Sequence, residues 1–87
     1  MASYSVRIKT SAAKELEAVE PRALRLRAVS RIQALAETPR PRGSQKLAGD
    51  EERYRIRQGV YRIVYSVDDE ARVVEVVKIG HRRDVYR

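Results

Sequence analysis

The last ten residues, KIGHRRDVYR, combine side chains that can bind phosphate with side chains that can move protons. They include the chain's only histidine, His81, followed by Arg82 and Arg83, and a tyrosine near the end, Tyr86. Histidine carries protons at neutral pH because its ordinary pKa is about 6.5, and arginine binds phosphate oxygens through a planar fork of donors. The tail therefore has the residue types of a phosphate-handling site, although each of them alone is also typical of a solvated chain end.

A second set of cations lies upstream, in the segment RYRIRQGVYRIVY. The period of two of a β-strand places Arg53, Arg55 and Arg57 on one face and the apolar side chains on the other. A two-residue turn at Gln58-Gly59 then places Arg55 opposite Arg62. Like charges directly opposite each other destabilise a strand pair by a few tenths of a kcal/mol. We therefore predict that these arginines form an anion-binding face rather than a merely solvated one.

The remaining sequence supplies the elements that hold these side chains in place. The patterns predict a strand at 3–9, a helix at 11–20 capped by Thr10 or Ser11, a helix at 21–37 that restarts at Pro21, and a loop at 38–45. Three consecutive strands joined by short turns follow, as in an antiparallel meander. We expect one α+β domain over residues 1–87, in the order βααβββ, with an antiparallel sheet packed on one face by the two helices.

The apolar positions of these elements predict the core. We expect helix residues Leu16, Val19, Leu24, Ile32 and Leu35 to meet strand residues Val6, Ile8, Tyr61, Ile63 and Tyr65. The polar face of the second helix is expected to carry Arg22, Arg25, Arg27 and Arg31. The face of the sheet that the helices leave open is then available to a ligand.

Composition narrows the class of partner. The 87 residues contain 19 Lys and Arg against 12 Asp and Glu, a net charge of +7, which is typical of a protein with a polyanionic or acidic partner. The absence of cysteine excludes a disulfide framework, and a single histidine makes a zinc site unlikely to form, so we expect neither a metal nor a cofactor. No apolar run approaches the ~20 residues of a membrane helix. We expect a cytoplasmic protein that does not enter a membrane.

The segments YRIRQGVYRIVYSV and VVKIGHRRDVYR closely resemble the RelE toxins of bacterial and archaeal toxin–antitoxin systems. The resemblance covers nearly the whole chain and implies the RelE/ParE fold. It also implies an endoribonuclease that cuts messenger RNA in the ribosomal A site, without a metal, by attack of the ribose 2′-hydroxyl. The implied partners are a cognate acidic antitoxin, in a toxin–antitoxin hetero-oligomer, and the ribosome with its mRNA.

The resemblance also assigns site residues. It places the family's basic hairpin positions on Arg55 and Arg57, its phosphate-binding arginine on Arg62, and its tail arginine and tyrosine on Arg82 and Tyr86. We expect the catalytic residues to be Arg62, Arg82, Tyr86 and His81, and the RNA-binding residues to be Arg55, Arg57, Lys46, Lys78 and Arg83. Family members often carry lysines where this chain has Arg55 and Arg57, and arginine cannot act as a base. The proton carrier is therefore either His81 or Tyr86, and the family arginine role falls on either Arg82 or Arg83.

Two other functions remain open at this point. The ParE branch of the same fold inhibits DNA gyrase and does not cut RNA, and it generally lacks the combination of Arg62, Arg82 and Tyr86. A plain basic RNA-binding module would expose aromatic rings for base stacking. The tyrosines of the hairpin are instead predicted to lie on the core face, which disfavours that function.

Overall fold

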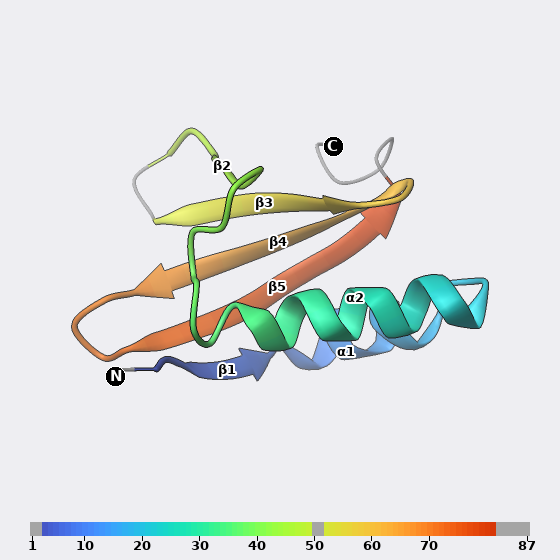
Figure 1. The fold of residues 1–87 in the computed structure, drawn as a ribbon, viewed down its shortest axis with the longest axis horizontal. Coiled ribbons are helices and arrows are strands. Elements are labelled where there is room, and N and C mark those ends of the chain that lie inside the picture. Colours follow the sequence, from blue (N-terminus) through green and yellow to red (C-terminus); the bar gives the residue numbers. More distant parts are fainter. Residues whose placement is uncertain (1–2, 50–51, 82–87) are drawn as a thin grey trace.

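The computed structural model, which describes residues 3–49 and 52–81, contains one five-stranded sheet and two helices (Figure 1). The elements are β1 (Ser5–Ile8), α1 (Thr10–Glu17), α2 (Arg22–Ala34), β2 (Gln45–Lys46), β3 (Arg53–Gln58), β4 (Tyr61–Asp68) and β5 (Val73–His81). The strands are ordered β1-β5-β4-β3-β2. The α+β class, the two N-terminal helices and the antiparallel meander β3–β5 are confirmed.

Two details of the sheet differ from the expectation. β1 pairs with β5 in parallel, so the sheet is mixed, because the chain crosses over through both helices before it returns to the far edge of the meander. The end of the predicted loop adds the two-residue strand β2 to the edge of β3. Neither pairing can be read from the alternation of a single strand, since both depend on distant segments.

The helix boundaries follow the local sequence. α2 begins directly after Pro21, whose fixed φ of −72° suits the entry to a helix, as expected. α1 begins at Thr10 with Lys9 in the cap position and no side-chain capping bond, so the expected cap by Thr10 or Ser11 is wrong. Both hydroxyl residues lie inside the first turn. Within the described residues, neither helix is long and apolar enough to cross a membrane.

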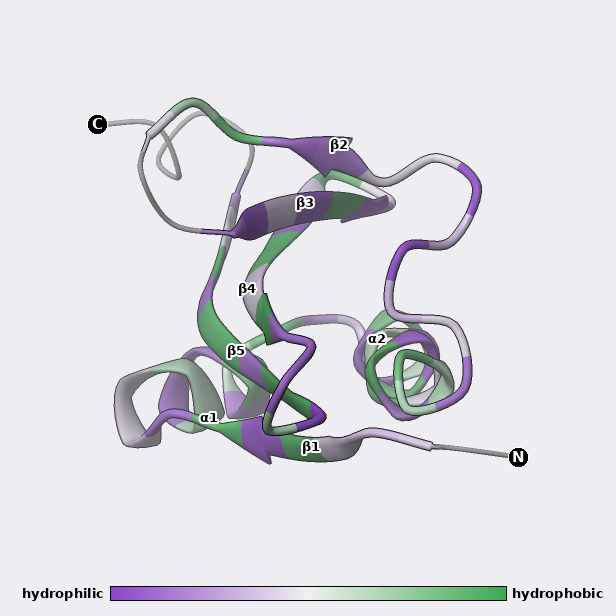
Figure 2. Ribbon diagram, turned by 90° about the vertical axis from the view of Figure 1, so that its left-hand side faces the viewer, coloured by the Kyte–Doolittle hydropathy of each residue, from purple (hydrophilic) through white to green (hydrophobic). Residues whose placement is uncertain are grey.

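The helices and the sheet enclose a single apolar cluster. Figure 2 looks along the axis of α2, which lies on one side of β4 and β5, with α1 beside β1 and β5. Ile32 of α2 and Leu35, the residue after this helix, are buried together with Ile63 and Tyr65 of β4, which confirms most of the predicted core. Ile8 is 38% exposed, so its assignment to the core is wrong. It is the last residue of an edge strand, where the chain leaves the sheet for α1.

The opposite side of the sheet, which we call the outer face, carries the charged side chains of the strands. Val64 is buried but lies outside the main core, since it alternates with the core residues of β4. Cross-strand pairing arranges this face in three rows: Arg57–Arg62–Gly80, Arg55–Val64–Lys78 and Arg53–Ser66–Glu75. α2 packs on the other side of the sheet and α1 lies at the β5 edge, so neither helix covers this face among the described residues.

A network of polar bonds ties the loop before β2 to the sheet. Arg40 donates to Asp69 at 2.8 Å and to the Tyr54 hydroxyl at 2.8 Å, and Tyr4 donates to Asp69 at 2.6 Å. The bonds from Arg40 and Tyr4 lower the pKa of Asp69 to about 2. The Tyr65 hydroxyl donates to the Pro39 carbonyl at 2.8 Å. The loop is therefore held against the core by specific contacts, although its sequence predicts only irregular structure.

Candidate nucleic-acid interface

The turn between β3 and β4 consists of Gly59 and Val60. Gly59 has a φ of +62°, and Val60 has a negative one, which is typical of a type II′ turn with glycine in its first position. The predicted turn at Gln58-Gly59 is therefore wrong by one residue, because it would place glycine second. In the observed register Arg57 lies opposite Arg62, and Arg55 lies opposite Val64.

Two arginines still lie opposite each other in the observed register, but the partner of Arg62 is Arg57 rather than Arg55. Gln58 and Tyr61 flank the turn and form its hydrogen-bonded pair, so the next pair, Arg57 and Arg62, is a non-hydrogen-bonded one. In such pairs the two Cα atoms approach to about 4.5 Å and the side chains lie close together. A hollow of about 130 Å³ beside them is lined by Arg57, Gly59, Tyr61 and Arg62. This arrangement concentrates positive charge at one end of the outer face.

The α2 helix holds this end of the hairpin. The Arg31 guanidinium donates from Nη1 to the Arg57 carbonyl at 2.9 Å and to the Gln58 side-chain oxygen at 3.2 Å. The carbonyl of Arg57 points away from β4, to the edge of β3 that β2 is too short to cover. A side chain on Gly59 would meet Leu24 of α2 at 3.0 Å. The helix thus fixes both the strand end and the turn.

Sequence reasoning missed the role of Arg31, which it placed on the solvent face of the helix. A signal was present, since Arg31 directly precedes the buried Ile32 and lies three residues after the buried Ala28. A long side chain beside an apolar stripe can lie along it and carry its charge to a neighbouring element.

Arg55 and Lys78 share the second row of the outer face with Val64. Arg55 is only 7% exposed, so it is less accessible than the other arginines of the hairpin. Lys78 binds the Glu15 carboxylate of α1 at 3.3 Å, and the other oxygen of Glu15 accepts from the Ile79 amide at 2.9 Å. Glu15 thereby covers the edge of β5 that extends beyond the short strand β1.

Lys46 does not join these residues. It pairs with Tyr54 across β2 and β3, and directly paired residues share a face, so it lies on the side of the core. The Lys46 ammonium binds the Glu52 carboxylate at 3.1 Å. The same carboxylate accepts a hydrogen bond from the Tyr54 hydroxyl at 2.7 Å. Lys46, expected among the RNA-binding residues, therefore lies on the other side of the sheet from Arg55 and Lys78. Two residues of strand are too few to show an alternation in the sequence.

His81 also lies elsewhere than expected. His81 was expected among the catalytic residues with Arg62, but β5 continues to His81, with Gly80 opposite Arg62. His81 pairs with Tyr61, and their rings meet edge to face with centroids 6.2 Å apart. The His81 ring therefore lies on the core side of the sheet, whereas the Arg62 side chain lies on the outer face. The other expected tail residues, Arg82, Arg83 and Tyr86, lie outside the described residues.

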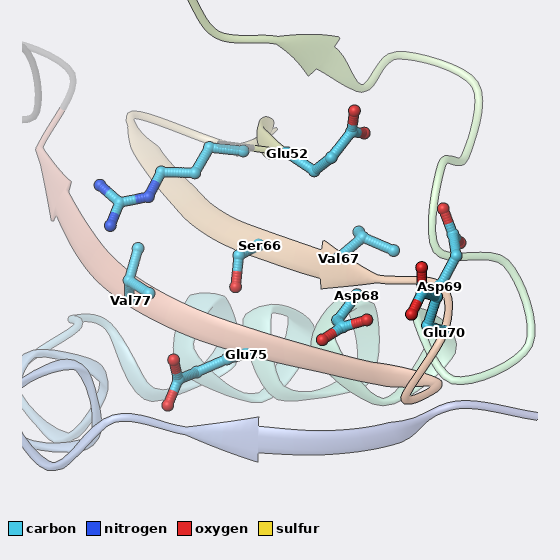
Figure 3. Close-up of a pocket in the computed structure, with 9 residues that line it drawn as sticks. Glu52, Ser66, Val67, Asp68, Asp69, Glu70, Glu75 and Val77 are labelled. Carbon is cyan, nitrogen blue, oxygen red and sulfur yellow. The ribbon is translucent and has the colours of Figure 1, made fainter. Parts of the chain in front are cut away.

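The other end of the outer face is acidic, which sequence reasoning did not foresee. A hollow of about 530 Å³ is lined by one cation, Arg53, and by five carboxylates (Figure 3). The carboxylates are Glu52, Asp68 at the end of β4, Asp69 and Glu70 of the β4–β5 turn, and Glu75 of β5. The signal was the placement of Glu75, which alternates with the buried Val74 and Val76. The outer face is thus divided into a basic end at the β3–β4 turn and an acidic end at the β4–β5 turn.

The chain has relatives of known family. A sequence profile described as "ParE toxin of type II toxin-antitoxin system, parDE" matches residues 6–86. The chain is 33% identical to Toxin RelG of Mycobacterium tuberculosis over 87 residues, with 97% of each chain covered. Its fold is similar to RelE in the RelE–RelB complex of Pyrococcus horikoshii, with a TM-score of 0.79, 30% identity and 95% and 99% of the two chains covered. It is also similar to the isolated E. coli RelE toxin, with a TM-score of 0.77, 30% identity and 91% and 84% covered.

Proposed function

The chain belongs to the RelE/ParE superfamily of toxins from type II toxin–antitoxin systems, and on this basis we propose that it is an endoribonuclease that cuts messenger RNA in the ribosomal A site. The observation that carries the proposal is the pair of Arg57 and Arg62, two cations placed side by side at the basic end of the outer face. Such a pair is costly for folding alone and favourable once an anion lies between the side chains.

RNA cleavage without a metal has three requirements, and arginines meet two of them. The ribose 2′-hydroxyl must lie in line with the phosphorus, and the charge that develops on the phosphate must be neutralised. We assign these tasks to Arg62 and Arg57, with Arg82 from the tail. Gly80, which lies opposite Arg62, has no side chain to compete for the space beside that guanidinium.

The third requirement is a group that takes a proton from the 2′-hydroxyl and another that gives one to the leaving 5′-oxygen. The His81 ring lies against Tyr61, across the sheet from the Arg62 side chain. We therefore assign the role at the 2′-hydroxyl to Tyr86 rather than to His81, and the leaving 5′-oxygen takes its proton from water. A tyrosine has an ordinary pKa of about 10, so nearby guanidinium groups would help it to ionise.

We further propose that an acidic antitoxin holds the protein inactive. The net charge of +7 favours a partner of opposite sign. Relatives from Pyrococcus horikoshii and E. coli have been solved as complexes of RelE with RelB. The expected observation is growth arrest when the chain is expressed alone, relieved when the neighbouring antitoxin gene is expressed with it.

A second candidate function, inhibition of DNA gyrase, is supported by the name of the matching profile. Two assays with the purified chain separate the candidates: cleavage of mRNA on programmed ribosomes and supercoiling of plasmid by gyrase. The proposal predicts cleavage with no effect on supercoiling. Inhibition of supercoiling without cleavage would establish the second candidate instead.

A further inference from the structure

A second basic hollow lies on the outer face, next to the arginine pair. It has a volume of about 300 Å³ and lies where β4 and β5 meet the segment that follows β2. Three cations line it, Lys9, Arg53 and Lys78, and apolar side chains line the rest. No acidic side chain among the described residues lines it. This combination suits a ligand with an anionic group and a flat apolar part.

Two of these cations are held in place by the backbone or by an ion pair. Lys9 follows β1, and its amide donates to the Val76 carbonyl of β5 at 2.9 Å. The ammonium of Lys78 is bound by Glu15 at 3.3 Å while its side chain stays 44% exposed. Both cations therefore extend from ordered backbone positions on the sheet, and a phosphate that binds Lys78 shares its ammonium with Glu15.

The apolar floor has a structural cause. Val64 pairs with Lys78, whereas the next residue of β4 pairs with Val76, so Val77 is an extra residue in a β-bulge. Bulges redirect side chains, and here both Val77 and Lys78 line the outer-face hollow. Val64 and Val77 then offer aliphatic surface directly beside the charged groups.

The hollow is one row away from the arginine pair. Val64 and Lys78 lie in the row next to that of Arg62, and rows of one face are two residues apart, or about 6.8 Å. An RNA strand whose scissile phosphate lies at Arg57 and Arg62 can therefore extend into the hollow with its neighbouring nucleotide. One row further, Glu75 begins the acidic end of the face, which repels a phosphate.

We propose that this hollow is a nucleotide subsite for the residue next to the scissile phosphate. Lys9 and Lys78 bind its phosphate, and its base lies against Val64, Val77 and the plane of the Arg53 guanidinium, a surface on which bases stack. Arg53 lies at the boundary with the acidic end, whose carboxylates keep the path of the RNA from continuing toward the β4–β5 turn. The inference rests on the proposed action on RNA, and it adds the extent of the RNA path and Lys9 as a contact.

The test measures binding without cleavage. Labelled full-length protein is titrated by NMR with 2′-O-methyl RNA, which lacks the attacking hydroxyl, as a dinucleotide and as a tetranucleotide. We expect the tetranucleotide to shift the amide signals of Val64 and Val77. Each phosphate contact to a single strand contributes about 0.7 to the slope of log K against log salt. Lys9→Ala should therefore lower the slope for the tetranucleotide by about 0.7, and Lys78→Gln should act in the same direction.

Lys14→Ala is the matched control, because Lys14 is an exposed lysine of α1 outside the hollow. Equal slopes for Lys9→Ala and Lys14→Ala would overturn the inference. So would a loss of antitoxin binding in Lys9→Ala with unchanged RNA affinity, which would identify the hollow as a peptide-docking surface. Binding of the tetranucleotide by a protein that never cuts RNA would instead remove the proposed function and leave the subsite standing.

Discussion

Arg57 and Arg62 lie directly opposite each other on β3 and β4, in a pair whose backbones do not bond to one another. This places two positive side chains at their closest cross-strand approach, next to the turn of the hairpin. Their repulsion opposes folding, and an anion bound between the two side chains relieves it.

Arg57→Glu should stabilise the folded protein, because it replaces a like-charge pair by an ion pair across the strands. We expect the free energy of unfolding in urea to rise by about 0.5–1 kcal/mol at low salt, and less at high salt. Arg27→Glu changes the net charge equally on an exposed helix position and is the control. If both variants gain the same stability, the pair is not under electrostatic strain.

Arg31→Ala should loosen the hairpin end that carries the arginine pair. It removes the 2.9 Å bond to the Arg57 carbonyl and the 3.2 Å bond to Gln58, with an expected loss of about 1 kcal/mol. Amide hydrogen exchange should rise at residues 57–62 and stay unchanged in α2. Arg31→Lys, which keeps a cationic donor on a shorter side chain, should restore part of the protection. Faster exchange throughout the sheet would instead indicate a general loss of stability.

Asp69 should make folding depend on pH in acid. Its pKa is lowered to about 2 by the Arg40 and Tyr4 bonds, against about 3.9 when unfolded. A lowered pKa stabilises the folded state fully above the unfolded value, so this contribution should be lost as the pH falls from about 4 toward 2. Asp69→Asn should flatten the unfolding curve in that window. Glu70→Gln, in the same turn, is the control, and an equal effect there would contradict the assignment.

The two candidate proton carriers, His81 and Tyr86, should contribute differently to the rate of RNA cleavage. Since the His81 ring packs against Tyr61, away from the Arg62 side chain, His81→Ala should cut programmed mRNA at nearly the wild-type rate and pH dependence. Tyr86→Phe should slow cleavage without changing the fold. A large loss in His81→Ala with little change in Tyr86→Phe would reverse the assignment.

Much of this architecture is predictable from the sequence, because alternation and helical spacing are local. The helices, the meander and the core positions of β4 follow from them. The turn register was not predictable in this way, since both Gln58-Gly59 and Gly59-Val60 have suitable residues and only the backbone angle of Gly59 decides. The position of His81 depends on whether Gly80 bends or stays in the strand, and pairing with Arg62 keeps it extended.

The role of Arg31, the acidic hollow at Glu75 and the hollow at Lys9 also could not be predicted from local sequence patterns. Arg31 of α2 donates a hydrogen bond to Arg57 of β3, which is 26 residues later in the sequence. The hollow at Lys9 depends on a parallel pairing between the two ends of the chain and on the bulge at Val77. Such features arise only when distant segments are brought together by the sheet.

The central claim is that Arg62 stabilises the cleaved phosphate of messenger RNA on the ribosome. The most direct measurement is the rate of cleavage of a defined mRNA on programmed ribosomes, with analysis of the product ends, for the wild type, Arg62→Ala and the exposed control Arg27→Ala. We predict that Arg62→Ala lowers the rate by about 10²–10³ while Arg27→Ala retains it, with products ending in a 2′,3′-cyclic phosphate or its 3′-phosphate. Cleavage by Arg62→Ala at the wild-type rate, or no cleavage by the folded wild type, would contradict the account.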